Sequence, residues 1–214
     1  IGGTEADQGL GIALDSDGNC YATGRTWSRD WTSGGWKTSF GGSEDAYVIK
    51  FNSAGGHEWS TYMGGIEADV GTGIAVDSFG NCLAAGYTSS AGWVSLGWDT
   101  SHGGTIYTDG YVVKFNSAGE HVWSTYLGAT LYDYAYSIAV DAEGNCYSAG
   151  ETNSNNWASG GWDIVKSGAY EGFVVKLNAL GAHLWSTYLG DTQFTSAYGL
   201  ATDPEGACYV TGNT

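Results

Sequence analysis

The segment IALDSDGNCYATG (12–24) returns three times along the chain, as IAVDSFGNCLAAG (74–86), IAVDAEGNCYSAG (138–150) and LATDPEGACYVTG (200–212). A second segment lies between these copies, as YVIKFNSAGGHEWSTYMGG (47–65), YVVKFNSAGEHVWSTYLG (111–128) and FVVKLNALGAHLWSTYLG (173–190). The cysteines of the first segment, at positions 20, 82, 146 and 208, are 62, 64 and 62 residues apart. A period of this size indicates stacked supersecondary units that bury their apolar faces against one another.

One repeat divides into four short apolar runs joined by turn signals. SDGN (16–19) and NSAGG (52–56) are typical of hairpin turns, because Asp and Asn bond their own backbone and Gly adopts positive φ. Four antiparallel strands joined by tight hairpins make the blade of a β-propeller. In the first repeat we expect the strands at 12–15, 20–26, 47–51 and 57–62.

The phrases GIALDSDGNCYATG (11–24), DAYVIKFNSAG (45–55) and WSTYMGG (59–65) resemble the bacterial beta-propeller repeats known as SBBP repeats. They are more distantly similar to NHL-type blades. The resemblance covers essentially the whole chain and implies a propeller of several blades in secreted or surface proteins, with no particular reaction. The long loop between the second and third strands departs from the family's usual blade.

The repeat phase predicts a single all-β propeller over residues 1–214, made of about three and a half blades of four antiparallel strands. By analogy with NHL blades, the first strand of each repeat is expected to be innermost. Such a chain leaves an unclosed ring, so it is either a fragment of a longer propeller or a unit that neighbouring copies complete. The repeats are expected at 11–64, 73–128, 137–190 and, as a half blade, 199–214.

Composition narrows the partners and the setting of the protein. Twenty-three acidic residues against 7 basic ones give a net charge of −16, which disfavours nucleic acid and anionic membrane surfaces as partners. No stretch approaches 18 apolar residues, so we expect no membrane span. The chain starts at Ile1 without Met, which indicates a mature or excised piece. Together with the resemblance, the charge favours an extracellular or cell-surface protein.

Pairs of tryptophans recur in the three long loops and are the leading candidates for ligand contact. Exposed indoles suit stacking on sugar rings, because they offer flat apolar faces and one N–H donor. The alternatives are packing between blades and contact with another protein. The loop tryptophans are Trp31, Trp36, Trp93, Trp98, Trp157 and Trp162.

Acidic residues recur where the chain enters the first and third strands of each blade. Both connections emerge on the same face of a four-stranded blade, and oxygen-rich sites of this kind suit Ca²⁺. Solvated carboxylates and loop caps are the alternative. The calcium candidates are Asp7, Asp45, Asp69, Asp109, Asp133 and Glu171. His57, His121 and His183 also occur once per repeat, but the outermost strand would hold them too far apart to share an ion.

The sequence contains no nucleophile elbow, zinc-protease motif, phosphate loop or dinucleotide fingerprint. We therefore expect a non-enzymatic extracellular scaffold or interaction module, part of a larger surface assembly, with no cofactor apart from the Ca²⁺ considered above. Its partners would be other protein chains or copies of itself. One alternative is a lectin-like propeller that binds glycan through the loop tryptophans. Another is part of a propeller lyase or hydrolase whose site lies outside this chain.

Overall fold

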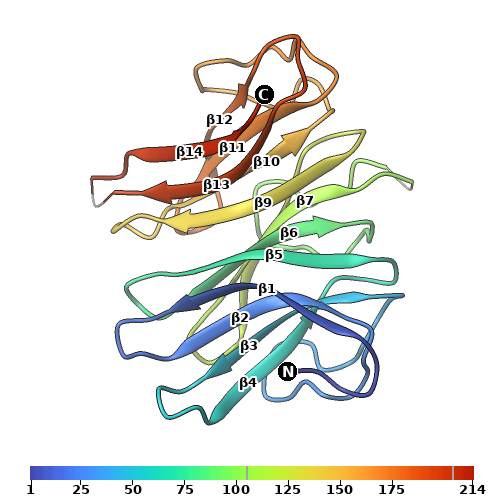
Figure 1. Cartoon of the computed structure of the whole chain (residues 1–214), viewed down its shortest axis with the longest axis vertical. Helices are drawn as coiled ribbons and strands as arrows, with labels where there is room; N and C mark the ends of the chain where they lie inside the picture. Colours follow the sequence, from blue (N-terminus) through green and yellow to red (C-terminus); the bar gives the residue numbers. More distant parts are fainter. Residues whose placement is uncertain (105, 204) are drawn as a thin grey trace.

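The computed structural model of the chain describes residues 1–104, 106–203 and 205–214, and every regular element among them is a β-strand. Hydrogen bonding groups the strands into three four-stranded antiparallel sheets and one two-stranded sheet. Figure 1 shows these sheets following one another along the long axis, from the N-terminal to the C-terminal end. The strands are β1 (Asp7–Leu14), β2 (Cys20–Thr26), β3 (Asp45–Phe51), β4 (His57–Met63), β5 (Asp69–Val76), β6 (Cys82–Thr88), β7 (Asp109–Phe115), β8 (His121–Leu127), β9 (Asp133–Val140), β10 (Cys146–Thr152), β11 (Glu171–Leu177), β12 (His183–Leu189), β13 (Ser196–Thr202) and β14 (Cys208–Asn213).

The arrangement confirms the predicted all-β propeller of about three and a half blades. We call β1–β4 blade 1, β5–β8 blade 2, β9–β12 blade 3 and β13–β14 the half blade; strand order in each equals chain order. The first strands of successive blades lie side by side, β1 against β5, β5 against β9 and β9 against β13. Between β5 and β9, Thr72 Oγ1 donates a hydrogen bond to the Ala135 carbonyl at 2.8 Å. The first strand of each blade is therefore the inner one.

Each blade begins earlier than its repeat boundary predicts. The inner strands start at Asp7, Asp69, Asp133 and Ser196, three or four residues ahead of the expected repeat starts. A bulge interrupts the register between Gly9 and Gly11, and the strand continues on the far side of it. The apolar run used to place the strand begins at Ile12, beyond that bulge, which explains the difference.

Side chains in the hairpin turns hold the backbone as the sequence predicts. In the first turn Asp15 Oδ1 accepts the Asp17 and Asn19 N–H groups at 3.0 and 2.9 Å, and Gly18 has a φ of 79°. In the second turn Asn52 Oδ1 accepts the Gly56 N–H at 2.8 Å. Because these bonds are local, each hairpin sets its own register before the blades pack.

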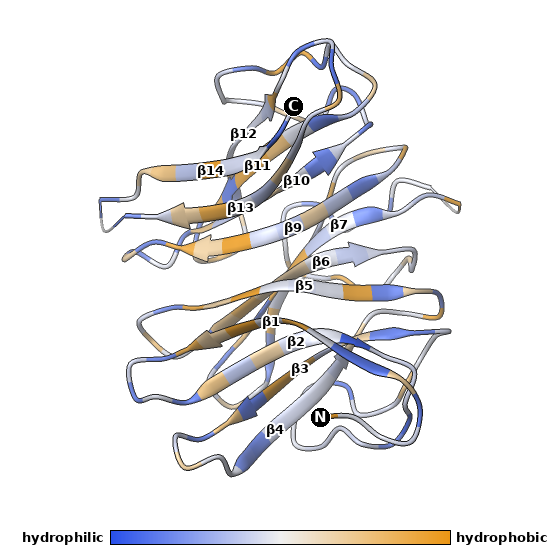
Figure 2. Ribbon diagram, viewed as in Figure 1, coloured by the Kyte–Doolittle hydropathy of each residue, from blue (hydrophilic) through white to orange (hydrophobic). Residues whose placement is uncertain are grey.

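The core lies between the blades, where apolar strand residues of one sheet meet those of the next. Figure 2 shows apolar residues concentrated within the strands and hydrophilic residues in many of the connecting turns. Trp59 and Trp123 are 3% and 2% exposed. Their indole N–H groups donate to turn carbonyls of the following blade, at Ser117 (3.1 Å) and Ala179 (3.2 Å). These outer-strand tryptophans thus fasten each blade to its neighbour.

A repeated lysine of the third strand forms ion pairs inside the blades. Lys114 pairs with Asp77 at 3.0 Å and Lys176 with Asp141 at 3.3 Å. Lys50 differs, because it pairs with Glu58 at 2.8 Å. In blade 3 the ammonium group also lies over the Tyr147 ring, 4.6 Å from its centroid.

Candidate functional site

Asp69, at the start of the inner strand of blade 2, carries a buried and fully hydrogen-bonded carboxyl group. Its Oδ1 accepts a short hydrogen bond from Thr88 Oγ1, and its Oδ2 accepts bonds from Ser90 Oγ and the Gly65 N–H, both at 3.0 Å. Thr88 Oγ1 in turn accepts the indole N–H of Trp93 at 3.1 Å. Thr88 faces Asp69 in the β5–β6 ladder, so strand register brings these groups together as a Trp–Thr–Asp network.

The Trp–Thr–Asp network occurs in each of the three complete blades. Its other copies are Trp31–Thr26–Asp7 and Trp157–Thr152–Asp133. Each indole also meets an aromatic ring of the third strand edge-on, with centroids 5.0 to 5.2 Å apart. Trp31, Trp93 and Trp157 are thus held by contacts within their own blades, which supports packing as their role.

The second tryptophan of each loop reaches the following blade. Trp36 stacks on His121 with ring centroids 4.5 Å apart, and Trp98 stacks on His183 at 4.2 Å. Burial lowers the pKa of both histidines, which keeps the stacked rings neutral. Trp36 and Trp98 are 38% and 37% exposed. One indole face of each is therefore engaged in joining two blades.

Trp162 occupies the corresponding place in blade 3 and is 87% exposed. The blade that follows is the half blade, which has no fourth strand among the described residues. Within residues 1–104, 106–203 and 205–214, no aromatic ring stacks on Trp162. Of the six predicted tryptophans, Trp162 is the most exposed, whereas Trp36 and Trp98 are about two-fifths exposed.

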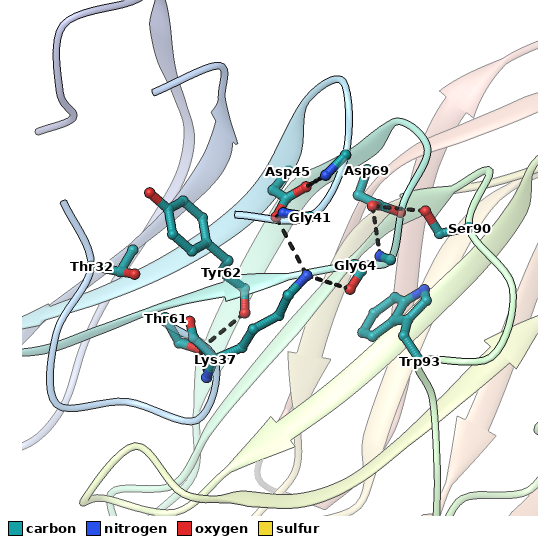
Figure 3. Close-up of polar contacts among 12 residues, drawn as sticks. Thr32, Lys37, Gly41, Asp45, Thr61, Tyr62, Gly64, Asp69, Ser90 and Trp93 are labelled. Carbon is teal, nitrogen blue, oxygen red and sulfur yellow. Dashed lines mark hydrogen bonds and ion pairs between the residues drawn. The ribbon is translucent and has the colours of Figure 1, made fainter. Parts of the chain in front are cut away.

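Asp45, at the start of β3, has an ion-pair partner that the sequence did not indicate. Lys37 Nζ lies 3.4 Å from Asp45 Oδ2 and donates to the Gly64 carbonyl at 2.8 Å (Figure 3). The Gly41 and Gly42 N–H groups also donate to this carboxylate, at 2.8 and 2.9 Å. Asp45 is completely buried, and these three donors balance its charge and hydrogen-bonding capacity.

The acidic residues meet across the blade junctions rather than within one blade. The charge of Asp45 acts on Asp69, which lies beside it in Figure 3, and that of Asp133 acts on Asp109. Burial, reinforced by these like charges, raises the pKa of Asp69 to about 7 and that of Asp109 to about 8. Burial raises the pKa of Asp133 to about 6, against the hydrogen bonds that Thr152 and Ser154 donate. These groups can therefore hold protons near neutral pH.

No cluster of three or more His, Cys, Asp or Glu side chains suited to a metal ion occurs in the described part of the chain. Asp7 is taken up by its Trp–Thr–Asp network, and Glu171 Oε1 accepts the N–H groups of Ser167 and Gly168. The six predicted calcium ligands are thus distributed over the blade junctions, with Asp45 and Asp69 at one and Asp109 and Asp133 at the next. A cation at one of these junctions would have few carboxylate ligands and would also need backbone oxygens as ligands.

The match to a known family follows the same period as the blades. The family model described as SBBP, beta-propeller repeat, matches residues 1–30, 58–92, 122–156 and 184–214, which is more than half of the chain. The chain belongs to the SBBP beta-propeller repeat family. Each internal match runs from the fourth strand of one blade through the first two strands of the next, so it spans a junction.

Two curated relatives share this sequence pattern at low identity. The regulatory protein FlaEY of Caulobacter vibrioides (strain ATCC 19089 / CIP 103742 / CB 15) is 25% identical over 186 residues, which cover 86% of this chain and 19% of that protein. An uncharacterized WD repeat-containing protein, L264, of Acanthamoeba polyphaga mimivirus is 24% identical over 181 residues, covering 72% of this chain and 13% of that protein. The chain thus spans less than a fifth of either relative.

Among solved structures, a protein whose title provisionally names a gluconolactonase superposes with a TM-score of 0.43 at 17% identity. The match covers 95% of this chain and 55% of that one. Within the described residues, no helix is long and apolar enough to cross a membrane.

Sequence reasoning missed two features of the junctions. The partners of Trp36 and Trp98 lie 85 residues further along the chain, and a recurring His in the outer strand was the only signal for them. The residue after the second loop tryptophan changes from Lys37 to Asp99 and Asp163, which is visible once the repeats are aligned on Trp36, Trp98 and Trp162.

Proposed function

We propose that this chain is a non-enzymatic interaction module, extracellular or at the cell surface, that packs against a further β-hairpin of its own repeat type, from the same polypeptide or from another copy. The observation that carries the proposal is the contrast between Trp162, which is 87% exposed, and its equivalents Trp36 and Trp98, which stack on the next blade. A hairpin resembling β11–β12 is the partner whose chemistry fits this side of the molecule.

The half blade offers a strand edge for such a hairpin. β14 pairs with β13 on one side, and no described strand pairs with its other edge. Unpaired backbone groups along an edge are the usual basis of strand addition. In complete blades this edge receives the third strand, as β10 receives β11 from Cys146↔Leu177 to Thr152↔Glu171.

The half blade also presents an acceptor for the repeated lysine. In blade 3, Lys176 lies opposite Tyr147 in the ladder and pairs with Asp141. In the half blade, the Tyr209 hydroxyl donates to Asp203 Oδ2 at 3.0 Å, and no described lysine pairs with Asp203. A Lys placed opposite Tyr209 would complete the same arrangement.

A third contact is available on the outer side. Trp59 and Trp123 each donate their indole N–H to the turn of the next blade's outer hairpin, at Ser117 and Ala179. Trp185 occupies the equivalent position in blade 3 and is only partly buried. The incoming turn would accept its N–H, and a His four residues beyond would stack on Trp162.

A synthetic peptide with the sequence of residues 171–189 tests the proposal. We expect it to bind the intact chain and quench tryptophan fluorescence. A Lys176→Glu version of the peptide should bind about tenfold more weakly. The Trp162→Ala chain should also bind more weakly, whereas the control Ile66→Ala, at a residue 77% exposed elsewhere, should not.

Absence of peptide binding, or equal binding by the Lys176→Glu peptide and by the Trp162→Ala chain, would refute the hairpin proposal. A glycan array run with the same chain variants tests the second candidate, a lectin-like module, which the exposed Trp162 ring also favours. Glycan binding lost in Trp162→Ala, without peptide binding, would favour that alternative. Fractionation of the source cells would test the extracellular location.

A further inference from the structure

Three equivalent loop positions share one backbone arrangement and differ in charge. The N–H groups of Lys37, Asp99 and Asp163 donate to the Oγ1 atoms of Thr61, Thr125 and Thr187 at 2.9, 2.8 and 2.8 Å. Their carbonyls accept the N–H groups of Tyr62, Tyr126 and Tyr188 at 2.8, 2.9 and 2.8 Å. The three residues therefore start from the same place, yet blade 1 has a cation there and blades 2 and 3 have carboxylates.

In blade 1 the cation balances a buried carboxylate. Figure 3 shows the Lys37 ammonium between Asp45 and the Gly64 carbonyl, which it contacts at 3.4 and 2.8 Å. Asp45 is completely buried. Lys37 thus supplies the positive charge that burial of Asp45 requires.

In blade 2 the equivalent carboxylate is Asp109. In blade 1 Asp45 has three donors, the Lys37 ammonium and the Gly41 and Gly42 N–H groups, and Asp109 keeps only the counterpart of one of them. It is 1% exposed, and its Oδ2 accepts the Gly103 N–H at 2.7 Å. The Gly104 N–H donates to His102 Nδ1 at 3.3 Å, whereas its blade 1 counterpart, the Gly42 N–H, donates to Asp45. Among the described residues nothing donates to the buried Oδ1 of Asp109, the counterpart of the Asp45 oxygen that accepts the Gly42 N–H, and no ammonium contacts Oδ2. A buried carboxyl oxygen without a partner is costly and needs an explanation.

The other groups discussed around Asp109 are two carboxylates and a backbone carbonyl. Asp99 and Asp133 both act on Asp109 and, with its burial, raise its pKa. Asp133 is already satisfied by Thr152, Ser154 and the Ala129 N–H. Gly128 is the repeat equivalent of Gly64, whose carbonyl Lys37 contacts, and the two glycines have similar φ values of 128° and 122°. The Gly128 carbonyl has no donor among the described residues.

We propose that Ca²⁺ binds between Asp109 and the Gly128 carbonyl, where the Lys37 ammonium lies in blade 1, with Asp99 supplying further charge and oxygen. One oxygen of Asp99 accepts the Ser101 N–H at 2.8 Å, and the other remains for the cation or its waters. Ca²⁺ accepts six to eight oxygen ligands in irregular geometry, so water would complete the shell. With so few protein ligands, the dissociation constant should be about 0.1–1 mM, as in extracellular modules.

Blade 1 is excluded as a calcium site because the Lys37 ammonium occupies the position. Blade 3 is a weaker candidate, because its long loop also contains a lysine. Glu171 has a buried Oε2 without a partner among the described residues, as Asp109 has its Oδ1. However, Lys166 Nζ contacts the Gly168 carbonyl at 2.5 Å, and the Gly168 N–H donates to Glu171. The Lys166 ammonium thus already occupies a backbone carbonyl of the loop whose N–H groups hold Glu171, and its charge disfavours a second cation there. We therefore expect one calcium per chain.

Calorimetric titration of the full chain with CaCl₂, paired with Trp-sensitised Tb³⁺ luminescence, tests the site. The wild type should bind one ion. Asp99→Lys rebuilds the blade 1 ion pair and should weaken binding about tenfold or more. The reciprocal variant, Lys37→Asp, should add a second site beside Asp45.

Thermal unfolding gives a readout independent of affinity. Calcium should raise the melting temperature of the wild type, and Asp99→Lys should reach a similar temperature without calcium. The proposal is overturned if the wild type binds no ion up to about 10 mM Ca²⁺, or if Asp99→Lys binds as well as the wild type. Should Asp109→Asn, the direct ligand variant, fail to fold, Asp99→Lys decides, because blade 1 shows that the position accepts lysine.

Discussion

Replacing Thr88 with valine should show that the Trp–Thr–Asp network, rather than burial alone, holds the long loop to the blade. Thr88 is completely buried, and valine has nearly the same shape. The change removes one oxygen atom that accepts the Trp93 indole N–H at 3.1 Å and the Ser90 N–H at 3.0 Å, and that donates to Asp69. Three polar groups would lose a partner at once.

The expected destabilisation follows from those three groups. A buried donor or acceptor left without a partner costs about 1–3 kcal/mol. Trp93 is only partly buried, so water can satisfy its N–H, and most of the loss falls on Ser90 and Asp69. We expect Thr88→Val to lower the free energy of unfolding by about 3–5 kcal/mol. Urea denaturation followed by circular dichroism and tryptophan fluorescence measures it.

Thr88→Ser is the matched control, because it keeps the hydroxyl group and deletes the methyl group. It should cost about 1 kcal/mol, as expected for one buried methyl group. The reasoning fails if Thr88→Val unfolds within about 1 kcal/mol of the wild type, or if Thr88→Ser is the less stable of the two. Either result would mean that apolar packing outweighs the hydrogen-bonded network.

Three further measurements address titration, stacking and thiol burial. Because the pKa of Asp109 is about 8 when folded and 3.8 when exposed, the folded chain holds more protons between these values. Its unfolding free energy should therefore fall by up to about 1.4 kcal/mol per pH unit as pH rises through this window, and Asp109→Asn should flatten the slope in urea titrations. Trp98→Ala should cost about 2 kcal/mol in urea unfolding, whereas Trp162→Ala should cost less than about 0.5 kcal/mol. Burial raises the pKa of the Cys146 thiol to about 12, so Ellman's reagent should label Cys146 only when the chain unfolds. The same reagent should label the partly exposed Cys20 in the native state. Rapid native labelling of Cys146 would contradict its burial.

The regular parts of the fold could be predicted because their determinants are local. The second strand of blade 1 runs from Cys20 to Thr26, as the sequence pattern predicts, since the turn before it is set by Asp15 and Asn19. The start of the inner strand could not be placed as well. The residues ahead of the bulge between Gly9 and Gly11 include Asp7 and Gln8, so no apolar run marks them as part of a strand.

The junction contacts could be predicted only in part, because they join residues far apart in sequence. Six carboxylates were recognised as repeating, but the pairing of Asp45 with Asp69 depends on how two blades meet. Lys37 was not singled out, because only one of the three loops has a lysine directly after its second tryptophan, and that is not a repeated feature. Its role appears only when the position of its ammonium group between Asp45 and the Gly64 carbonyl is known.

In a chain built from repeats, a position where the residue type changes between blades is one where the fold does not require a particular side chain. The backbone at Lys37 and Asp99 forms the same hydrogen bonds to Thr and Tyr, so either side chain satisfies the blade. The inversion of charge between them therefore has no origin in strand pairing or turn geometry. It leaves the buried Asp109 carboxyl without the ammonium that contacts Asp45 in blade 1, a cost that an external cation removes. That choice distinguishes a junction that closes by itself from one whose stability depends on the calcium concentration around it.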